Sequence, residues 1–180
     1  MIRIYTDASA REGFKPGFAV IVTRKGKFVE CVAGLSSRQG SKDKWGMDVH
    51  VAEARGVVVG LLVAARYGAG CTVFTDSAVV VECVELMLKG ESRDRVAQRL
   101  QTTWYRVASF AIIEIVNLLG GADLSSAKVK WIPKGSDKWN VLADEAANQA
   151  RLMGNDPKVP DEDKYYWLDR VGQLCQPDFV

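Results

Sequence analysis

The hydrophobic pattern of this chain changes its period once, and that change limits the folds open to it. In the first third, short stretches alternate apolar and polar residues, as β-strands with one buried face do. From about His50, apolar residues recur mainly at helical spacing, and two short strand-like runs interrupt them. Strands followed by alternating helices and strands predict an α/β fold with a mixed sheet.

Three strands are expected first, at Ile2–Ala8, Phe18–Thr23 and Lys27–Ala33. The turn residues of Gly13–Gly17 and the Lys25-Gly26 pair separate them, which predicts an antiparallel meander. A polar loop is expected over 34–46, before the helical region.

The rest of the chain predicts four or five helices and two more strands. The helix that starts near His50 should bury Ala52, Val57, Leu61, Leu62 and Ala65. The following elements are expected at Cys71–Thr75 (strand), 77–88 (helix), Ser92–Leu119 (helical, with a break near Thr102), Lys128–Ile132 (strand) and Asn140–Leu152 (helix, capped by Asn140). The order βββαβα(α)αβα predicts a five-stranded mixed sheet with helices on both faces.

Length and composition favour one compact domain at 1–153, followed by an acidic, aromatic tail at 154–180. The apolar runs are too short to span a bilayer, and the N-terminus lacks the pattern of a secretion signal, so we expect a cytoplasmic protein without a membrane partner. The aromatic cluster at 165–167 either packs on the sheet or contacts a protein partner, and the sequence does not identify that partner. Four scattered cysteines are expected to be reduced core thiols.

Charge is unevenly distributed along the chain. Arg24–Lys44 holds six basic residues and two acids, Lys89–Arg106 holds five and two, and 154–180 holds three and six. A basic body with an acidic tail fits a surface that binds a polyanion, although each patch taken alone is better explained as a solvated face.

Four carboxylates stand at positions where ligand sites form. Asp7 and Asp76 lie at or after the ends of predicted strands, whereas Glu53 and Asp144 are expected in the first turns of helices. If they converge, two such charges about 5 Å apart repel by roughly 3 kcal/mol at an effective dielectric of about 20. Mg²⁺ or Mn²⁺ is the natural counter-ion for an all-oxygen site, and two ions can together promote phosphodiester hydrolysis.

The residues around these acids resemble type I ribonucleases H. The matching segments are IYTDAS at 4–9, HVAEARGVVVGL at 50–61, FTDS at 74–77 and KVKWIPKGSDKWNVLADEAANQA at 128–150. Asp7, Glu53, Asp76 and Asp144 match the four family carboxylates, and Asn140 matches an asparagine four positions before the last of them. The resemblance implies a ribonuclease H-like fold, a site for two Mg²⁺ or Mn²⁺ ions and cleavage of the RNA strand of RNA–DNA hybrids.

The chain also departs from the family pattern. The loop histidine is absent, since Ser136 follows Gly135, with Lys134 and Lys138 nearby. A lysine can hold a phosphate but carries protons poorly near neutral pH, so we expect a slower enzyme or an alkaline optimum. His50 stands where the family has an asparagine; it either contacts substrate or serves the helix N-terminus.

By the resemblance, the expected substrate-binding residues are Ser9, His50, Ser77, Arg95, Arg99, Lys134, Ser136, Lys138 and Asn140. Arg95 and Arg99 lie where some family members carry a basic protrusion, although a solvated helix face is equally compatible with this pattern. The leading interpretation is a hybrid endonuclease. The alternatives are a nuclease of the same fold that acts on another nucleic-acid structure, and a non-catalytic module that binds hybrids or proteins.

Overall fold

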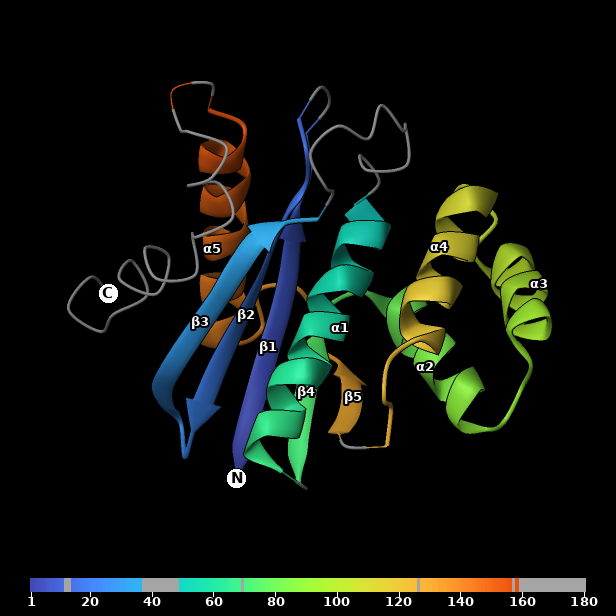
Figure 1. The fold of residues 1–180 in the computed structure, drawn as a ribbon, viewed down its shortest axis with the longest axis horizontal. Coiled ribbons are helices and arrows are strands. Elements are labelled where there is room, and N and C mark those ends of the chain that lie inside the picture. The colour runs from blue at the N-terminus through green and yellow to red at the C-terminus, as the bar shows by residue number, and fades with distance from the viewer. Residues whose placement is uncertain (12–13, 37–48, 69, 126, 157, 159–180) are drawn as a thin grey trace.

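A computed structural model describes residues 1–180 except 12–13, 37–48, 69, 126, 157 and 159–180. The elements, in chain order, are β1 (Ile2–Ser9), β2 (Gly17–Arg24), β3 (Lys27–Leu35), α1 (Val49–Tyr67), β4 (Cys71–Thr75), α2 (Ala78–Leu88), α3 (Arg93–Thr103), α4 (Ser109–Gly120), β5 (Ala127–Trp131) and α5 (Lys138–Gly154). This order confirms the predicted α/β arrangement (Figure 1).

The five strands form one mixed sheet in the order β3-β2-β1-β4-β5. The meander of β1, β2 and β3 is antiparallel, while β4 pairs parallel to β1 and β5 parallel to β4. β1 is therefore the central strand, with the meander on one side and the βα units on the other. Its carboxyl end lies beside that of β4, where ligand sites form in open sheets of this kind.

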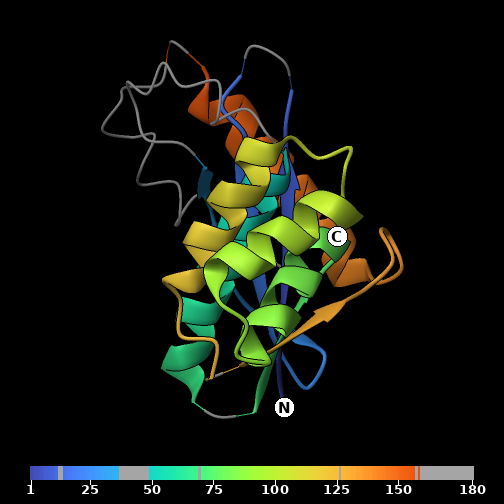
Figure 2. The same cartoon turned by 90° about the vertical axis from the view of Figure 1, so that its right-hand side faces the viewer.

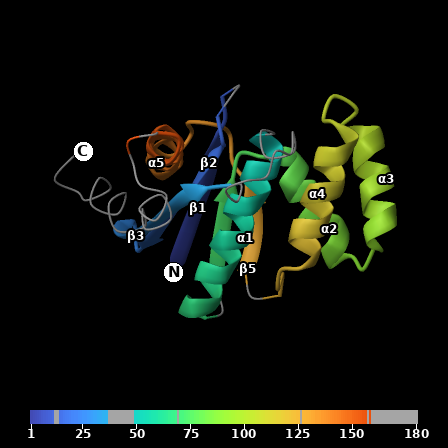
Figure 3. The same ribbon diagram turned by 45° about the horizontal axis from the view of Figure 1, so that its top comes forward.

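Helices cover both faces of the sheet. α1 to α4 enclose the larger apolar core on one face, and α5 alone packs on the other against β1, β2 and β3. Figure 3 shows α1 and α5 on opposite sides of the sheet, and Figure 2 shows α3 and α4 on the outer side of their layer. β1 serves both cores because Ile4 faces the α1 layer and Tyr5 faces α5, each side chain almost fully buried.

Close packing of both layers depends on glycines at two positions. A Cβ on Gly17 of β2 would come within 2.3 Å of the carbonyl oxygen of Ala147 in α5. A Cβ on Gly60 of α1 would come within 3.0 Å of the Thr6 methyl group in β1. The helices thus approach the sheet to a distance that a side chain at either position would prevent.

Two local expectations need correction. Leu62 and Ala65 are exposed on α1, because Gly56, Gly60 and their small neighbours form the face that meets the sheet. The expected 34–46 loop begins two residues late, since β3 runs to Leu35; 37–48 are outside the described residues.

The region predicted as one long helical segment divides into α3 and α4 at 104–108, close to the expected break. Cys31, Cys71 and Cys83 are buried and form no disulfide, as expected of core thiols, whereas Cys175 lies outside the described residues. The predicted acidic tail stays a prediction, because 159–180 lie outside the described residues. Of the helices in the described ranges, none has both the length and the apolar character needed to cross a membrane.

Candidate active site

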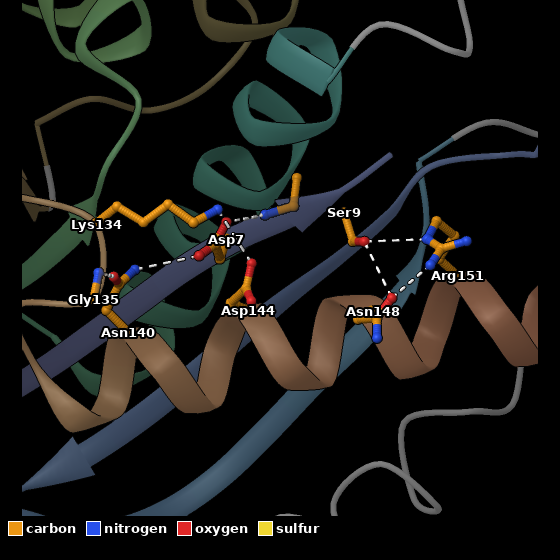
Figure 4. A network of polar contacts seen from close by, with 9 residues as sticks. Asp7, Ser9, Lys134, Gly135, Asn140, Asp144, Asn148 and Arg151 are labelled. Atoms are coloured by element: carbon orange, nitrogen blue, oxygen red, sulfur yellow. Dashed lines mark hydrogen bonds and ion pairs between the residues drawn. The ribbon is translucent and has the colours of Figure 1, made fainter. Parts of the chain in front are cut away.

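Asp7 lies near the end of the central strand and is 2% exposed. One carboxylate oxygen, Oδ1, accepts a 2.7 Å hydrogen bond from the Ala8 backbone N–H. The other, Oδ2, accepts a 3.4 Å bond from Nδ2 of Asn140 in α5. The strand alternation directs Asp7 to the α5 face, so a buried carboxylate is held between β1 and α5 (Figure 4).

Asp76 is brought to the same place by the parallel register of β1 and β4. Thr6 pairs with Thr75, so the residue after each strand position, Asp7 and Asp76, lies at the same level of the sheet. The Oδ1 atom of Asp76 is buried and has no hydrogen-bond partner. Its backbone carbonyl accepts a 3.1 Å bond from Nε1 of Trp131, at the end of β5.

The remaining two carboxylates come from helices, one on each face of the sheet. Glu53 lies in α1, and its Oε2 is 3.3 Å from Nδ1 of His50. Asp144 lies in α5. Both residues belong to second helical turns, not the first turns that we expected, because α1 begins at Val49 and α5 at Lys138.

Mutual repulsion and burial perturb the acids at the sheet edge. Burial, together with the negative charges of Asp76 and Asp144, raises the pKa of Asp7 to about 7, against the opposing effects of the hydrogen bond from the Ala8 N–H and of the Lys134 charge. Burial also raises the pKa of Asp76, and Glu53 is the next largest cause. All four predicted carboxylates are thus electrostatically coupled at one end of the sheet, where their negative charge favours a cation or a proton.

A loop at 133–137 carries Lys134 into this acidic cluster. The Lys134 Nζ atom donates to Asp144 Oδ1 at 3.4 Å. Gly135 has a φ of 69°, a conformation that glycine adopts without strain, and its N–H donates to Asn140 Oδ1 at 3.0 Å. The loop is therefore tied to α5 at the residue that also binds Asp7 (Figure 4).

Asn140 is not the N-cap of α5 that we predicted. Asp137 is the N-cap of α5, and its carboxylate accepts a 2.8 Å bond from the Trp139 N–H. Asn140 is 1% exposed, and both ends of its side-chain amide form hydrogen bonds. The NH₂ group donates to Asp7, and the oxygen accepts from the Gly135 N–H. The sequence singled out Asn140 as a cap and as a substrate contact, and it did not predict the internal bridge that Asn140 makes.

The other expected substrate contacts fall into three groups. Ser9 is used internally: its Oγ accepts a 3.1 Å bond from Arg151 Nε. Ser77 is buried, with a hydroxyl that has no hydrogen-bond partner. Ser136 and Lys138 are exposed on the loop side, and Lys138 Nζ lies 4.7 Å from the centre of the Trp139 ring.

Arg95 and Arg99 are exposed on α3, and Arg99 pairs with Glu91 at 3.3 Å. Arg99 also lines an open groove of about 350 Å³, together with Trp104 and Trp131. Trp131 connects this groove to the backbone of Asp76, but α3 itself adds no side chain to the carboxylate cluster among the contacts described above.

Arg151 is a buried polar residue that the sequence reasoning missed. It is 7% exposed, and its Nη1 atom is buried without a hydrogen-bond partner. Nη2 donates to Asn148 Oδ1 at 2.6 Å (Figure 4). Its signal in the sequence is periodic: Asn140, Ala143, Ala147 and Arg151 follow one face of α5, at positions where a surface helix would place apolar residues.

The donor set of this cluster fits a hard divalent cation in charge and in atom type. It consists of carboxylate oxygens, and the buried Asp76 Oδ1 has no donor to balance it. In the described part of the chain, no group of three or more His, Cys, Asp or Glu side chains is gathered closely enough to hold a metal ion as it stands. Lys134 instead balances part of the negative charge.

Comparisons with known proteins identify the fold. No family model matches the sequence, and no curated protein matches it. A solved structure of LC11-RNase H1, isolated from compost by a metagenomic approach, is similar with 19% identity and a TM-score of 0.52, over 82% of this chain and 93% of that one.

A foamy viral protease-reverse transcriptase, solved in complex with an RNA/DNA hybrid, is similar with 15% identity and a TM-score of 0.54. The match covers 82% of this chain but 19% of the viral chain, so the likeness is to one part of a larger protein. At these identities the likeness concerns the fold, which agrees with the element order and sheet described above. The chain has a ribonuclease H-like fold.

Proposed function

We propose that this chain is a metal-dependent endonuclease that hydrolyses the RNA strand of RNA–DNA hybrids by a two-metal-ion mechanism. The observation that carries the proposal is the convergence of Asp7, Glu53, Asp76 and Asp144, which come from four separate elements and influence one another electrostatically. Four acids whose charges interact at one end of the sheet favour a metal site over a surface that only binds nucleic acid, because binding a polyanion calls for positive charge.

Mg²⁺ or Mn²⁺ ions would be held by these four carboxylates. When bound, such ions supply the charge that lowers the pKa of an attacking water and stabilises the leaving oxygen of a phosphodiester. The protein's own contribution is to position the carboxylates: Asn140 and the Ala8 N–H fix both oxygens of Asp7, and His50 contacts Glu53. No nucleophilic side chain is needed.

The expected substrate-binding residues fall into an exposed group and a buried group. The exposed Lys134, Ser136 and Lys138 are available to phosphates near the carboxylates, and Arg95 and Arg99 to phosphates farther along a bound duplex. Ser9, Ser77 and Asn140 are partly or fully buried, so we assign them a part in holding the site. A foamy viral protein of this fold was solved with an RNA/DNA hybrid, which supports the same partner for this chain.

Cleavage of end-labelled RNA–DNA hybrid in Mg²⁺ and in Mn²⁺ tests the proposal, with duplex RNA and duplex DNA as matched substrates. We expect cuts in the RNA strand of the hybrid only. Asp76→Asn should reduce the rate by a factor of about 100 or more while hybrid binding persists, because a carboxylate that anchors a metal is removed. No cleavage by folded wild-type protein with either metal would refute the proposal.

Two observations favour the alternative of a non-catalytic hybrid-binding module. The acids are not gathered into a ready metal cage in the described residues, and the loop histidine is replaced by Ser136. In that case wild type and Asp76→Asn would bind hybrid equally and neither would cut it. Cleavage of duplex RNA or duplex DNA in place of hybrid would instead indicate a nuclease with a different substrate.

A further inference from the structure

Lys134 places a positive charge inside the acidic cluster. Its Nζ atom lies 3.4 Å from Asp144 Oδ1. Partial burial lowers the pKa of this ammonium, but Asp7, Asp144 and Asp76 together raise it above its ordinary value, so it remains protonated. In turn Lys134 lowers the pKa of both Asp7 and Asp76. One ammonium therefore balances three carboxylates at the same time.

The loop that carries Lys134 is built to hold it there. Gly135 donates to Asn140, and Ser136 N–H donates to the Pro133 carbonyl at 3.1 Å, which closes the turn. Because Asn140 also donates to Asp7, it fixes the position of the loop backbone relative to the buried Asp7 carboxylate. Figure 4 shows the Lys134 side chain extending from this loop across Asp7 to Asp144.

The ammonium itself is held much less tightly than its backbone. The Lys134 side chain is 70% exposed, its contact with Asp144 is long for a hydrogen bond, and the Asp144 side chain is 46% exposed. A mostly solvated ion pair of this kind is weak and opens readily. Meanwhile Asp76 Oδ1 stays without a donor, so the lysine neutralises the cluster only in part.

We propose that Lys134 is an internal counter-ion that occupies the carboxylate cluster when no divalent cation is bound and is displaced when one binds. The inference rests on the proposed metal site and goes beyond it by assigning a competitor for that site within the chain. Two cations that neutralise the same carboxylates must bind in competition, so Lys134 weakens metal affinity and stabilises the metal-free fold. The lysine thereby sets the divalent cation concentration at which the site fills.

Mn²⁺ titration of the full chain by calorimetry tests the inference with four proteins. Lys134→Met removes the charge, and Lys134→Arg keeps it. Lys138→Met removes a nearby charge at the start of α5, where the Lys138 ammonium lies over the Trp139 ring. We expect Lys134→Met to bind Mn²⁺ about three to five times more tightly than wild type, as removal of a mostly exposed ion pair predicts. Lys134→Arg and Lys138→Met should stay within about a factor of two.

Thermal unfolding provides a readout that does not depend on catalysis. In EDTA, Lys134→Met should melt below wild type, and saturating Mn²⁺ should raise its melting temperature by more than that of wild type. If wild type binds Mn²⁺ and Lys134→Met binds it equally or more weakly, the counter-ion inference is wrong and the proposed metal site stands. If none of the four folded proteins binds Mn²⁺, the proposed function itself is overturned.

Discussion

Replacing Asp7 with asparagine should stabilise the metal-free protein, and the gain should increase with pH. Asp7 is 2% exposed, and burial, with repulsion from Asp76, raises its pKa from 3.8 to about 7. The protonated carboxyl of Asp7 therefore contributes fully to stability below the pKa that Asp7 has in the unfolded chain. This contribution is lost as the pH rises through the pKa that Asp7 has in the fold. Asparagine has nearly the same shape and no charge, so it removes this loss.

The magnitude follows from the two pKa values. With 3.8 for the unfolded chain and about 7 for the fold, ionisation of Asp7 lowers the free energy of unfolding by about 4 kcal/mol at pH 8 and about 2 kcal/mol at pH 5. Asparagine gives up the bond from Asn140, which removes roughly 1 kcal/mol at either pH. The difference between the two pH values, about 2–3 kcal/mol, is independent of that bond.

The assay is thermal unfolding of wild type and Asp7→Asn in EDTA at pH 5 and pH 8. The advantage of the variant should increase by about 5–10 °C between the two, since 1 kcal/mol corresponds to roughly 2–4 °C for a chain of this size. Asp123→Asn is the matched control, because hydrogen bonds from Ser125 lower the pKa of Asp123 and the pH trend should be absent or reversed. A gain equal at both pH values, or a variant less stable at pH 8, would refute the argument.

Two other substitutions test the packing and the bridge that position the site. Gly17→Ala would place a methyl group 2.3 Å from the Ala147 carbonyl and should lower stability by about 1–3 kcal/mol, measured by urea unfolding; Gly34→Ala, whose nearest neighbour would lie at 3.6 Å, is the control and should have a much smaller effect. Asn140→Ala leaves the Gly135 N–H and Asp7 without their partner and should lower the unfolding free energy by about 1–3 kcal/mol, with faster hydrogen exchange at residue 135; unchanged exchange there would contradict the bridge.

Local periodicity carried most of the fold prediction. Elements with a clear apolar pattern, such as β1 and α2, have predicted bounds within one residue of the observed ones. The buried face of α1 was misassigned because hydrophobicity marks Leu62 as a core residue and ignores glycine. In the structure Leu62 is 64% exposed, and Gly60 faces β1, since close approach to the sheet requires the absence of a side chain there.

The sequence allowed prediction of which residues belong to the candidate site, but not of the contacts that their side chains make. The acids could be named from their neighbouring residues, as could Asn140, but the partners of these side chains are set by tertiary contacts. Asp7 and Asn140 are 133 positions apart, and Ser9 and Arg151 are 142 apart. No local pattern specifies which way such side chains point, which explains why the Lys134 contact and the buried guanidinium of Arg151 were not anticipated.

The amide of Asn140 has a direction, and this restricts how the 133–137 loop can change. In the observed orientation its NH₂ group faces Asp7 and its oxygen faces the Gly135 N–H. Turned over, it would oppose two donors at one end and two acceptors at the other. Exposed side chains on the loop are thus free to vary, whereas an inserted or deleted residue would move position 135 away from its acceptor. Related chains that keep this asparagine should therefore keep the loop length even where its sequence differs.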